Sequence, residues 1–337
     1  MTVSFLIPTW NRRDLLESAL ASVLVQSRPP HQILVVDNGS QDGSEEAARA
    51  AGARVLQLGS NRGFSFAVNR GLEAACGDAV AVINNDVQLA PDWTEKLSAA
   101  LRNDDCWFAI GKLLDATNPG RIDGVGDAVS RGGAGCRLGH ARPDGPWFNR
   151  SRRTYFPSAT AVLARREFFT RVGAFEEAFF AYLEDVDLGL RAALLGLGGV
   201  YVPEALAYHR GSSTVGPWSP DHVEWMSRNQ LLLLAKFYPL GLLARFWRPV
   251  AAAQLLWAAM AIRRKRGRAY ARGLCQGLIA AAALRRASSR WRADGQRLAE
   301  VLVSSEREVA CFEQATGWDP YWRWYFRLAP APPETQP

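Results

Sequence analysis

Two hydrophobic periods alternate along the first 105 residues. Short apolar runs predict strands at 3–7, 33–36, 54–58 and 79–83. Apolar residues at helical spacing predict helices at 13–25, 45–51 and 69–75. Strands that alternate with helices favour parallel pairing, with helices covering both faces of the sheet. We therefore predict an α/β fold with a mostly parallel sheet.

The pattern changes twice beyond residue 105. Gly, Arg and Asp are frequent between about 105 and 155, which predicts irregular loops or short antiparallel strands, and ordered strand and helix patterns return over 156–205. Beyond residue 230 the composition shifts to Leu, Ala, Arg and Trp. We expect one α/β domain over 1–235, with halves at about 1–105 and 106–235. A helical region over 236–328 and a disordered tail over 329–337 would follow.

Length and cysteine content narrow the class of protein. The chain has 337 residues and 48% hydrophobic content, enough for a full core and an appended segment. Its five cysteines are scattered without a Cys-x-x-Cys pair, so nothing suggests a zinc or redox site. The same pattern fits a protein of a reducing compartment. No apolar run reaches the roughly 18 residues of a membrane span, and the N-terminal apolar run resembles a strand more than a signal peptide. We expect a cytoplasmic protein.

Three acidic or amide-rich segments follow apolar runs: VVDNGSQDGS at 35–44, INND at 83–86 and FFAYLEDVD at 179–187. Strand ends in α/β proteins carry ligand-binding groups, and carboxylates there suit Mg²⁺ or Mn²⁺ bound to a diphosphate. Asp37 is a candidate contact for a base or ribose, although a simple Asx turn explains it equally well. Asp86 is a candidate metal ligand, or part of a polar turn before the helix that starts near Trp93.

The segment FFAYLEDVDLGLRAALLG predicts a helix with one buried stripe, formed by Leu183, Val186, Leu190 and Ala193. Asp187 and Arg191 are spaced as an ordinary i, i+4 ion pair. Asp185 has Gly189 at its i+4 position, so it is a candidate general base, or else an acid favoured by the helix dipole. His209 follows an apolar strand and is either a metal ligand or a structural histidine.

The order of these segments resembles the family 2 glycosyltransferases of GT-A fold, in their rhamnosyltransferase-like branch. The matching runs are SFLIPTWNR, LVVDNGSQDGS, NRGFSFAVNRGLEAACGDAVAVINNDV, GAFEEAFFAYLEDVDLGLRAALLG and YHRGSST, and together they span about residues 3–235. The resemblance implies a Rossmann-like, mostly parallel mixed sheet flanked by helices, with a C-terminal helical extension.

The resemblance also implies a role for individual residues. Nucleotide contacts would come from Pro8, Thr9, Asn11, Asp37, Asn61, Gly63, Asn84 and Asn85. Asp86 and His209 would bind Mg²⁺ or Mn²⁺, and Asp185 would be the catalytic base with Glu184 as support. Two positions depart from the family pattern: Asn84 replaces the first Asp of the metal element, and Val68 replaces an arginine near the nucleotide. Losing the charge at Asn84 would make metal affinity depend more on the substrate's phosphates.

The reaction implied is inverting, metal-dependent sugar transfer. Rhamnose is the first candidate sugar, carried by dTDP-rhamnose or a UDP-sugar to a lipid-linked or glycan acceptor in cell-surface polysaccharide synthesis. Glucose, galactose or GlcNAc transfer is the alternative within the family. Asn84 also keeps open a catalytically weak or dead membrane-associated subunit of a polysaccharide assembly complex. A pyrophosphorylase would need a Gly-rich basic loop where this chain has PTWNRRD, and a dehydrogenase would need Gly-x-Gly-x-x-Gly.

Positive charge is concentrated near the C-terminus. Residues 240–300 contain thirteen Lys or Arg and two acids, a local charge of +11 in a chain whose total is +7. Leu, Ala and Trp interleave with these cations, which predicts amphipathic helices lying on the anionic inner face of the cell membrane. Packing on the catalytic domain or in a homodimer is the alternative. We expect no nucleic-acid binding, because acids on the catalytic side would repel phosphate backbones.

Overall fold

The computed structural model describes residues 1–211 and 216–330, and the chain divides into two compact units. The first unit comprises Met1–Asp127 and Gly139–Thr214, and the second comprises Ala128–Leu138 and Val215–Pro337. The sequence pattern placed the boundary near residue 235. Contacts place it earlier, because the helix α7 (Pro220–Phe237) belongs to the second unit.

The first unit is built on a mixed sheet with the order β10-β12-β6-β11-β4-β1-β2-β3. Its parallel half consists of β1 (Val3–Thr9), β2 (Gln32–Asp37), β3 (Arg54–Gln57) and β4 (Ala79–Ile83). β11 (Ala161–Arg165) runs antiparallel to both β4 and β6 (Phe108–Asp115), and β6 pairs in parallel with β12 (Gly199–His209). Shorter strands are β5 (Val87–Leu89), β7 (Asn118–Gly124) and β10 (Arg152–Thr154), while β8 (Asp127–Val129) and β9 (Gly135–Arg137) pair separately.

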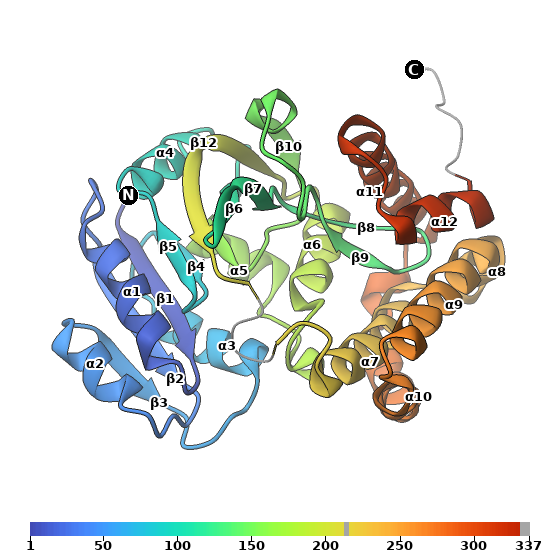
Figure 1. Cartoon of the computed structure of the whole chain (residues 1–337), viewed down its shortest axis with the longest axis horizontal. Helices are drawn as coiled ribbons and strands as arrows, with labels where there is room; N and C mark the ends of the chain where they lie inside the picture. Colours follow the sequence, from blue (N-terminus) through green and yellow to red (C-terminus); the bar gives the residue numbers. More distant parts are fainter. Residues whose placement is uncertain (212–215, 331–337) are drawn as a thin grey trace. The chain divides into compact units, whose positions relative to one another are not determined.

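Helices cover both faces of this sheet (Figure 1). One face packs on α1 (Arg13–Leu24), α2 (Ser44–Ala50) and α4 (Trp93–Ala100), because alternate β1 residues such as Phe5 share a core with Leu16 and Trp93. The opposite face packs on α3 (Phe64–Ala74) and α5 (Arg166–Val172), with α6 (Glu184–Leu195) beside α5. Single 3-10 turns form at Pro146–Asn149 and Glu177–Phe179.

The strands and helices predicted before residue 105 are confirmed, although α3 begins at Phe64 instead of near 69. The expectation of loops or short strands over 105–155 is wrong for β6, which lies inside the sheet. The sequence FAIGKLLD does not indicate a buried strand, because it contains a lysine, Lys112, which is nevertheless buried. The ammonium group of Lys112 lies 2.9 Å from the Asp144 carboxylate, which offsets the loss of hydration.

The second unit is helical. It contains α7, α8 (Leu240–Arg245), α9 (Trp247–Arg263), α10 (Gly267–Ala287), α11 (Gly295–Thr316) and α12 (Pro320–Leu328), with a 3-10 turn at Ser289–Arg292. α10 packs closely on α7 through glycines at helical spacing. A Cβ on Gly273 would lie 2.2 Å from the Glu224 carbonyl oxygen. The 331–337 part of the tail predicted to be disordered lies outside the described residues, and Ala329 is buried.

The segment Ala128–Leu138 is an internal part of this helical unit. Arg131 forms an ion pair with Glu306 of α11, in which Nε donates to Oε1 at 2.8 Å and the backbone N–H donates to Oε2 at 2.7 Å. The Tyr325 hydroxyl of α12 donates to the same carboxylate at 2.8 Å. Both charged side chains are largely buried, so the segment and two C-terminal helices satisfy one another's polar groups.

The sheet leaves no room for a side chain at Gly111 of β6. A Cβ there would lie 2.1 Å from the Ala205 carbonyl oxygen, beside the irregular register of β12. We predict that Gly111→Ala lowers the free energy of unfolding by about 1–3 kcal/mol, measured by urea denaturation. The control Gly145→Ala, which meets nothing within 4 Å, should change it by less than about 0.5 kcal/mol. Equal effects of the two variants would contradict this.

Candidate active site

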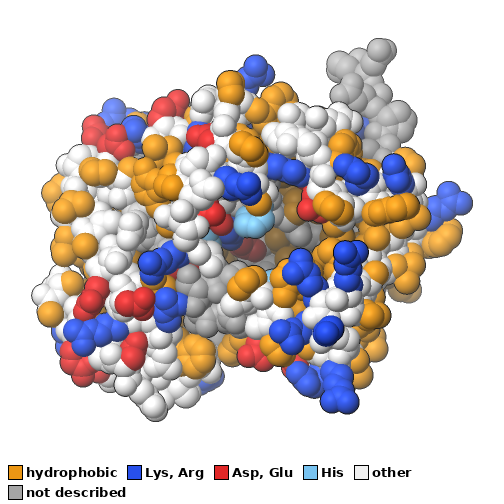
Figure 2. Space-filling model, viewed as in Figure 1, with side chains coloured by type: hydrophobic (Ala, Val, Ile, Leu, Met, Phe, Trp, Pro, Cys, Tyr) orange, Lys and Arg blue, Asp and Glu red, His pale blue; other side chains and the backbone are white. Residues whose placement is uncertain are grey.

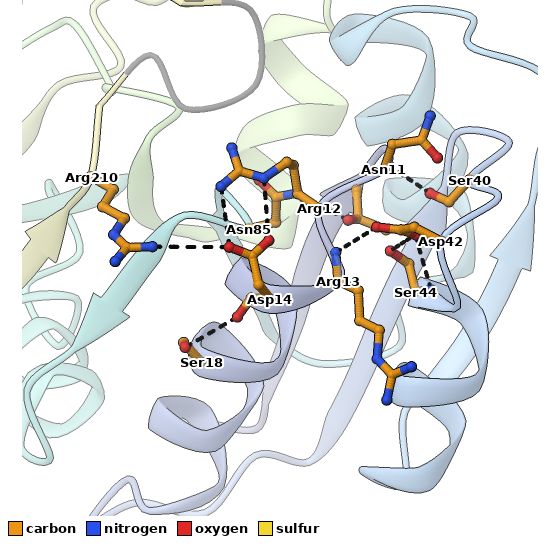
Figure 3. A network of polar contacts seen from close by, with 11 residues as sticks. Asn11, Arg12, Arg13, Asp14, Ser18, Ser40, Asp42, Ser44, Asn85 and Arg210 are labelled. Atoms are coloured by element: carbon orange, nitrogen blue, oxygen red, sulfur yellow. Dashed lines mark hydrogen bonds and ion pairs between the residues drawn. The ribbon is translucent and has the colours of Figure 1, made fainter.

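The carboxyl ends of β1, β2 and β4 bring together the residues predicted to contact a nucleotide. Asn85, after β4, donates to the Thr9 hydroxyl of β1 at 3.0 Å. Asn11 connects the loops after β1 and β2, since its N–H donates to Ser40 at 2.9 Å and its Oδ1 accepts from the Gln41 N–H at 2.8 Å (Figure 3). Pro8 and Asp37 are buried in the strands beside them. These loops therefore form one polar edge.

An exposed ion-pair network borders this edge (Figure 3). The Arg12 Nε lies 3.2 Å from Asp14 at the start of α1, and Arg210 lies 4.0 Å from the same carboxylate. Exposed pairs of this kind contribute little stability. Arg210 directly follows His209, and backbone pairing of His209 with Val87 of β5 holds the end of β12.

Asn61 and Gly63 form a tight turn held by Asn38. The Asn38 amide donates to the Gly63 carbonyl at 3.1 Å and accepts from the Arg62 N–H at 2.9 Å. Gly63 has a φ of 88°, and a Cβ there would lie 2.5 Å from the Phe180 ring. Glycine is required on both counts. The turn thus joins the β2 loop to the segment that precedes α6.

His209 lies between two carboxylates. Its Nδ1 is 2.8 Å from Asp123 Oδ2, and its Nε2 is 3.2 Å from Asp86 Oδ1. All three side chains are buried. Burial alone would lower the pKa of His209, but hydrogen bonds to Asp123 and Asp86 and their charges outweigh burial and raise the pKa to about 9.

This arrangement fits a divalent cation with two protein ligands. Asp86 and the Nε2 atom of His209 face one another, while Asp123 binds the opposite ring nitrogen and so orients the imidazole. Within 1–211 and 216–330, no group of three or more His, Cys, Asp or Glu side chains forms a metal site. The remaining ligands would have to come from a diphosphate and water, as is usual for Mg²⁺.

Asn84 lies two residues before Asp86. Its backbone N–H donates to the Thr160 carbonyl at 2.9 Å, and its side-chain Oδ1 is buried without a hydrogen-bond partner among the described residues. A buried polar atom in that state requires an explanation. A ribose hydroxyl or a metal-bound water would satisfy it.

A strained loop precedes the predicted base. Phe180, Tyr182 and Leu183 have φ values of 62°, 69° and 66°, which non-glycine residues rarely adopt. The Phe180 carbonyl accepts from the Ser65 N–H of α3 at 3.2 Å. The Asn69 amide binds both the carbonyl and the N–H of Phe175. The first two turns of α3 therefore bind this loop and the segment before it.

Glu184 and Asp185 begin α6 in different environments. Glu184 is buried, and burial together with the charges of Asp185 and Asp127 raises its pKa well above the usual value. Asp185 is half-buried and accepts a hydrogen bond from the Val186 N–H at 2.8 Å. Glu184 therefore favours its neutral form, which makes Asp185 the better candidate for a base.

The predicted pair of Asp187 and Arg191 is confirmed at 2.8 Å. It is not an ordinary surface pair, because both side chains are buried and Arg191 also donates to the Val172 carbonyl at 2.9 Å. The pair joins α6 to the end of α5.

Comparison with known proteins identifies the family. The family model described as "Glycosyl transferase family 2" matches residues 4–172. The chain belongs to glycosyl transferase family 2. This family assignment confirms the resemblance seen in the sequence, and the enzyme is a glycosyltransferase.

Relatives of this glycosyltransferase include the N-acetylglucosaminyl-diphospho-decaprenol L-rhamnosyltransferase of Mycobacterium tuberculosis. It is 33% identical over 251 residues, covering 67% of this chain and 82% of the relative. The O-antigen biosynthesis protein RfbC of Myxococcus xanthus is 28% identical, covering 67% of this chain but 18% of that protein. The likeness to the M. tuberculosis enzyme makes this glycosyltransferase rhamnosyltransferase-like.

A solved structure confirms the fold. The crystal structure of GalNAc-T7 with UDP, GalNAc and Mn²⁺ aligns with a TM-score of 0.60 at 15% identity, covering 84% of this chain. This glycosyltransferase spans 57% of the length of that structure. The expected GT-A architecture is therefore confirmed.

Three contributors to the site were not predicted. Asn38 is adjacent to the candidate Asp37, but its sequence context indicates only a turn. Asp123 and Asp127 lie in the GRIDGVGD stretch, whose composition resembles that of any loop. Their signal was two acids four residues apart, too weak to single out.

No described helix of this glycosyltransferase has both the length and the apolar content needed to span a bilayer.

Asp123 should act on metal binding through His209. We predict that Asp123→Asn weakens Mn²⁺-dependent binding of UDP or dTDP by about 10–100-fold in calorimetry, because the imidazole loses its anionic hydrogen-bond partner. Nucleotide binding in EDTA should not change. The control His140→Asn alters an exposed ring beside the Asp123 backbone and should bind as the wild type does. Equal losses with and without metal would assign Asp123 a purely structural role.

Proposed function

We propose that this enzyme transfers rhamnose from a nucleotide-diphosphate sugar, dTDP-rhamnose or a UDP-sugar, with inversion at the anomeric carbon. The proposed acceptor is a lipid-linked or glycan molecule in cell-surface polysaccharide synthesis. The observation that carries the proposal is the facing pair of Asp86 and His209, held by Asp123. Asp86 follows β4 and His209 ends β12, and Arg210 lies 4.0 Å from Asp14 at the nucleotide edge.

The nucleotide would occupy the polar edge formed by the strand ends. Asp37 suits a contact with the base or ribose, and the Asn61–Gly63 turn brings backbone close to the ligand. Asn84 offers its unsatisfied Oδ1 to a ribose hydroxyl or a bound water. Mg²⁺ or Mn²⁺ bound by Asp86 and His209 would neutralise charge on the departing diphosphate. The two protein ligands make that site dependent on the donor itself.

Asp185 is the proposed general base. It would accept the proton of an acceptor hydroxyl as that oxygen attacks the anomeric carbon opposite the nucleotide. Its half-buried position and the neutral tendency of Glu184 support this assignment. The proton moves to the Asp185 carboxylate, the sugar moves to the acceptor oxygen, and the nucleoside diphosphate leaves. A single displacement inverts the configuration without a covalent sugar-enzyme intermediate.

The nature of the acceptor follows from the relative. The name of the M. tuberculosis enzyme describes transfer to a sugar on a diphospho-decaprenol. A polyprenyl acceptor of that class lies at a membrane. We therefore propose that this enzyme works as a peripheral protein on the anionic inner face of the cell membrane.

The base assignment predicts a separation of binding from turnover. Asp185→Asn should retain donor affinity in calorimetry and lose about 10²–10⁴-fold in transfer rate. The matched control Asp92→Asn removes an exposed acid paired with Lys96 and should keep wild-type turnover. Wild-type turnover by Asp185→Asn would remove this residue from the role, and an unchanged anomeric configuration in the product would exclude inversion.

The donor assignment predicts selective stabilisation. With Mn²⁺, dTDP-rhamnose should raise the melting temperature more than UDP-glucose, UDP-galactose or UDP-GlcNAc, because ligand at 100 times its Kd adds about 2.7 kcal/mol of stability. EDTA should reduce the shift. A larger shift in melting temperature with another sugar nucleotide would assign that compound as the donor. No shift with any of them, together with no donor hydrolysis, would favour the non-catalytic subunit.

A further inference from the structure

The outer face of α9 is apolar and exposed. Trp247, Leu255 and Ile262 are 60%, 67% and 64% exposed and recur at intervals of eight and seven residues. At 100° per residue, this spacing places them within about 80° of one another on the helix. The opposite side of α9 packs inward, where Trp257 is buried and donates to the Ser227 hydroxyl at 2.9 Å. The exposed row is therefore a second apolar face that the fold does not use.

α10 presents a similar row. Leu278 and Ile279 are 68% and 81% exposed, the latter the highest value among the exposed large hydrophobic residues of the described chain. Gly273 and Gly277 occupy the side that packs on α7. The outward side is completed by small residues, including Ala282. Two helices that contact each other thus each keep an apolar row in solvent.

Cations, and no acids, accompany these rows. Residues 247–287 contain nine Lys or Arg and no Asp or Glu. Arg263, Lys265 and Arg268 are exposed around the turn between the helices, and Arg286 is exposed near the end of α10. Figure 2 shows Lys and Arg side chains gathered with hydrophobic ones over the region that α7, α9 and α10 occupy in Figure 1. This charge pattern complements an anionic surface.

The charge of α11 differs from that of α9 and α10. α11 carries four glutamates, Glu300, Glu306, Glu308 and Glu313, against two arginines. The aromatic α12 buries Trp322 and Tyr325 inside the helical unit, and exposes Trp324 and Leu328 beside two exposed arginines. The 236–328 region is therefore not uniform: its acid-free stretch, residues 236–293, contains α9 and α10.

We propose that α9 and α10 form an interfacial docking surface for anionic lipid, made of Trp247, Leu255, Ile262, Leu278 and Ile279 with the cations of 263–268. The helices would lie in the plane of the membrane, with the apolar rows at the acyl boundary and the cations among the headgroups. This proposal rests on the proposed function only for its biological purpose, the capture of a lipid-linked acceptor.

Vesicle sedimentation with the full chain tests the surface. Wild-type protein should bind vesicles of phosphatidylcholine with 30% phosphatidylglycerol and bind pure phosphatidylcholine vesicles much more weakly. Arg263→Gln, Lys265→Gln and Arg268→Gln combined should weaken binding about a hundredfold, since each cation near an anionic surface contributes about fivefold. Leu255→Gln, Ile262→Gln and Ile279→Gln combined should weaken it at least about tenfold while preserving every charge.

Matched controls distinguish binding through this surface from non-specific adsorption of the protein to vesicles. Leu24→Gln removes an exposed leucine of α1, and Arg54→Gln with Arg102→Gln removes exposed cations from the first unit. Both control proteins should bind vesicles as the wild type does. Wild-type vesicle binding by the apolar triple variant would overturn the proposal. The proposal would also be wrong if the wild type is a dimer in light scattering and this variant is a monomer with unchanged vesicle binding. Tighter binding of the wild type to duplex DNA than to vesicles would overturn it as well.

Donor hydrolysis separates this proposal from the proposed function. The docking variants should hydrolyse the nucleotide sugar at the wild-type rate in detergent-free buffer and lose transfer only to an acceptor held in vesicles. Vesicle binding by a protein that shows no donor hydrolysis would support the surface while refuting the transferase assignment. Hydrolysis without vesicle binding would refute the surface alone.

Discussion

The contact of His209 with Asp86 and Asp123 is the constraint on which the polar edge of the sheet depends. Two buried carboxylates so close together would repel one another, and an imidazole between them makes their burial tolerable. The three residues come from the loop after β4, from β7 and from the end of β12, where His209 pairs with Val87 of β5, directly after Asp86. A site that stabilises a cation in its own structure is already organised for one supplied with the substrate.

Much of the fold was predictable because the early strands contain short apolar runs. Val3–Thr9 and Ala79–Ile83 are buried on both faces, so their composition shows without reference to partners. β6 was not predictable, because Lys112 owes its burial to Asp144, a residue 32 positions away. α3 was underestimated, since it begins at Phe64, directly after Gly63, and the predicted helix covers only 69–75. Local pattern predicts an element well only when its neighbours impose no unusual burial.

The residues of the candidate site likewise fall into those that the local sequence indicates and those that depend on distant partners. Asp37, Asp86 and His209 end or follow recognisable strands and Asp185 begins a recognisable helix, so the sequence order and the family resemblance were enough to propose them. Asp123 became visible only through its distance to His209, and Asn38 only through its hold on the 61–63 turn. Supporting residues lack a signature of their own, because their chemistry is defined by the residue that they orient. Burial likewise gave Glu184 and Asp185 different character, although they are neighbours in sequence.

The placement of Ala128–Leu138 among the C-terminal helices affects how the chain folds during synthesis and how the enzyme can evolve. Its partners Ser305, Glu306 and Tyr325 leave the ribosome some 175 to 195 residues after it, so this segment must wait for nearly the whole chain before its hydrogen bonds can form. The helical unit is therefore not a detachable appendage. Evolution could exchange it between transferases only together with a loop from the middle of the gene, which ties the inheritance of the two parts to each other.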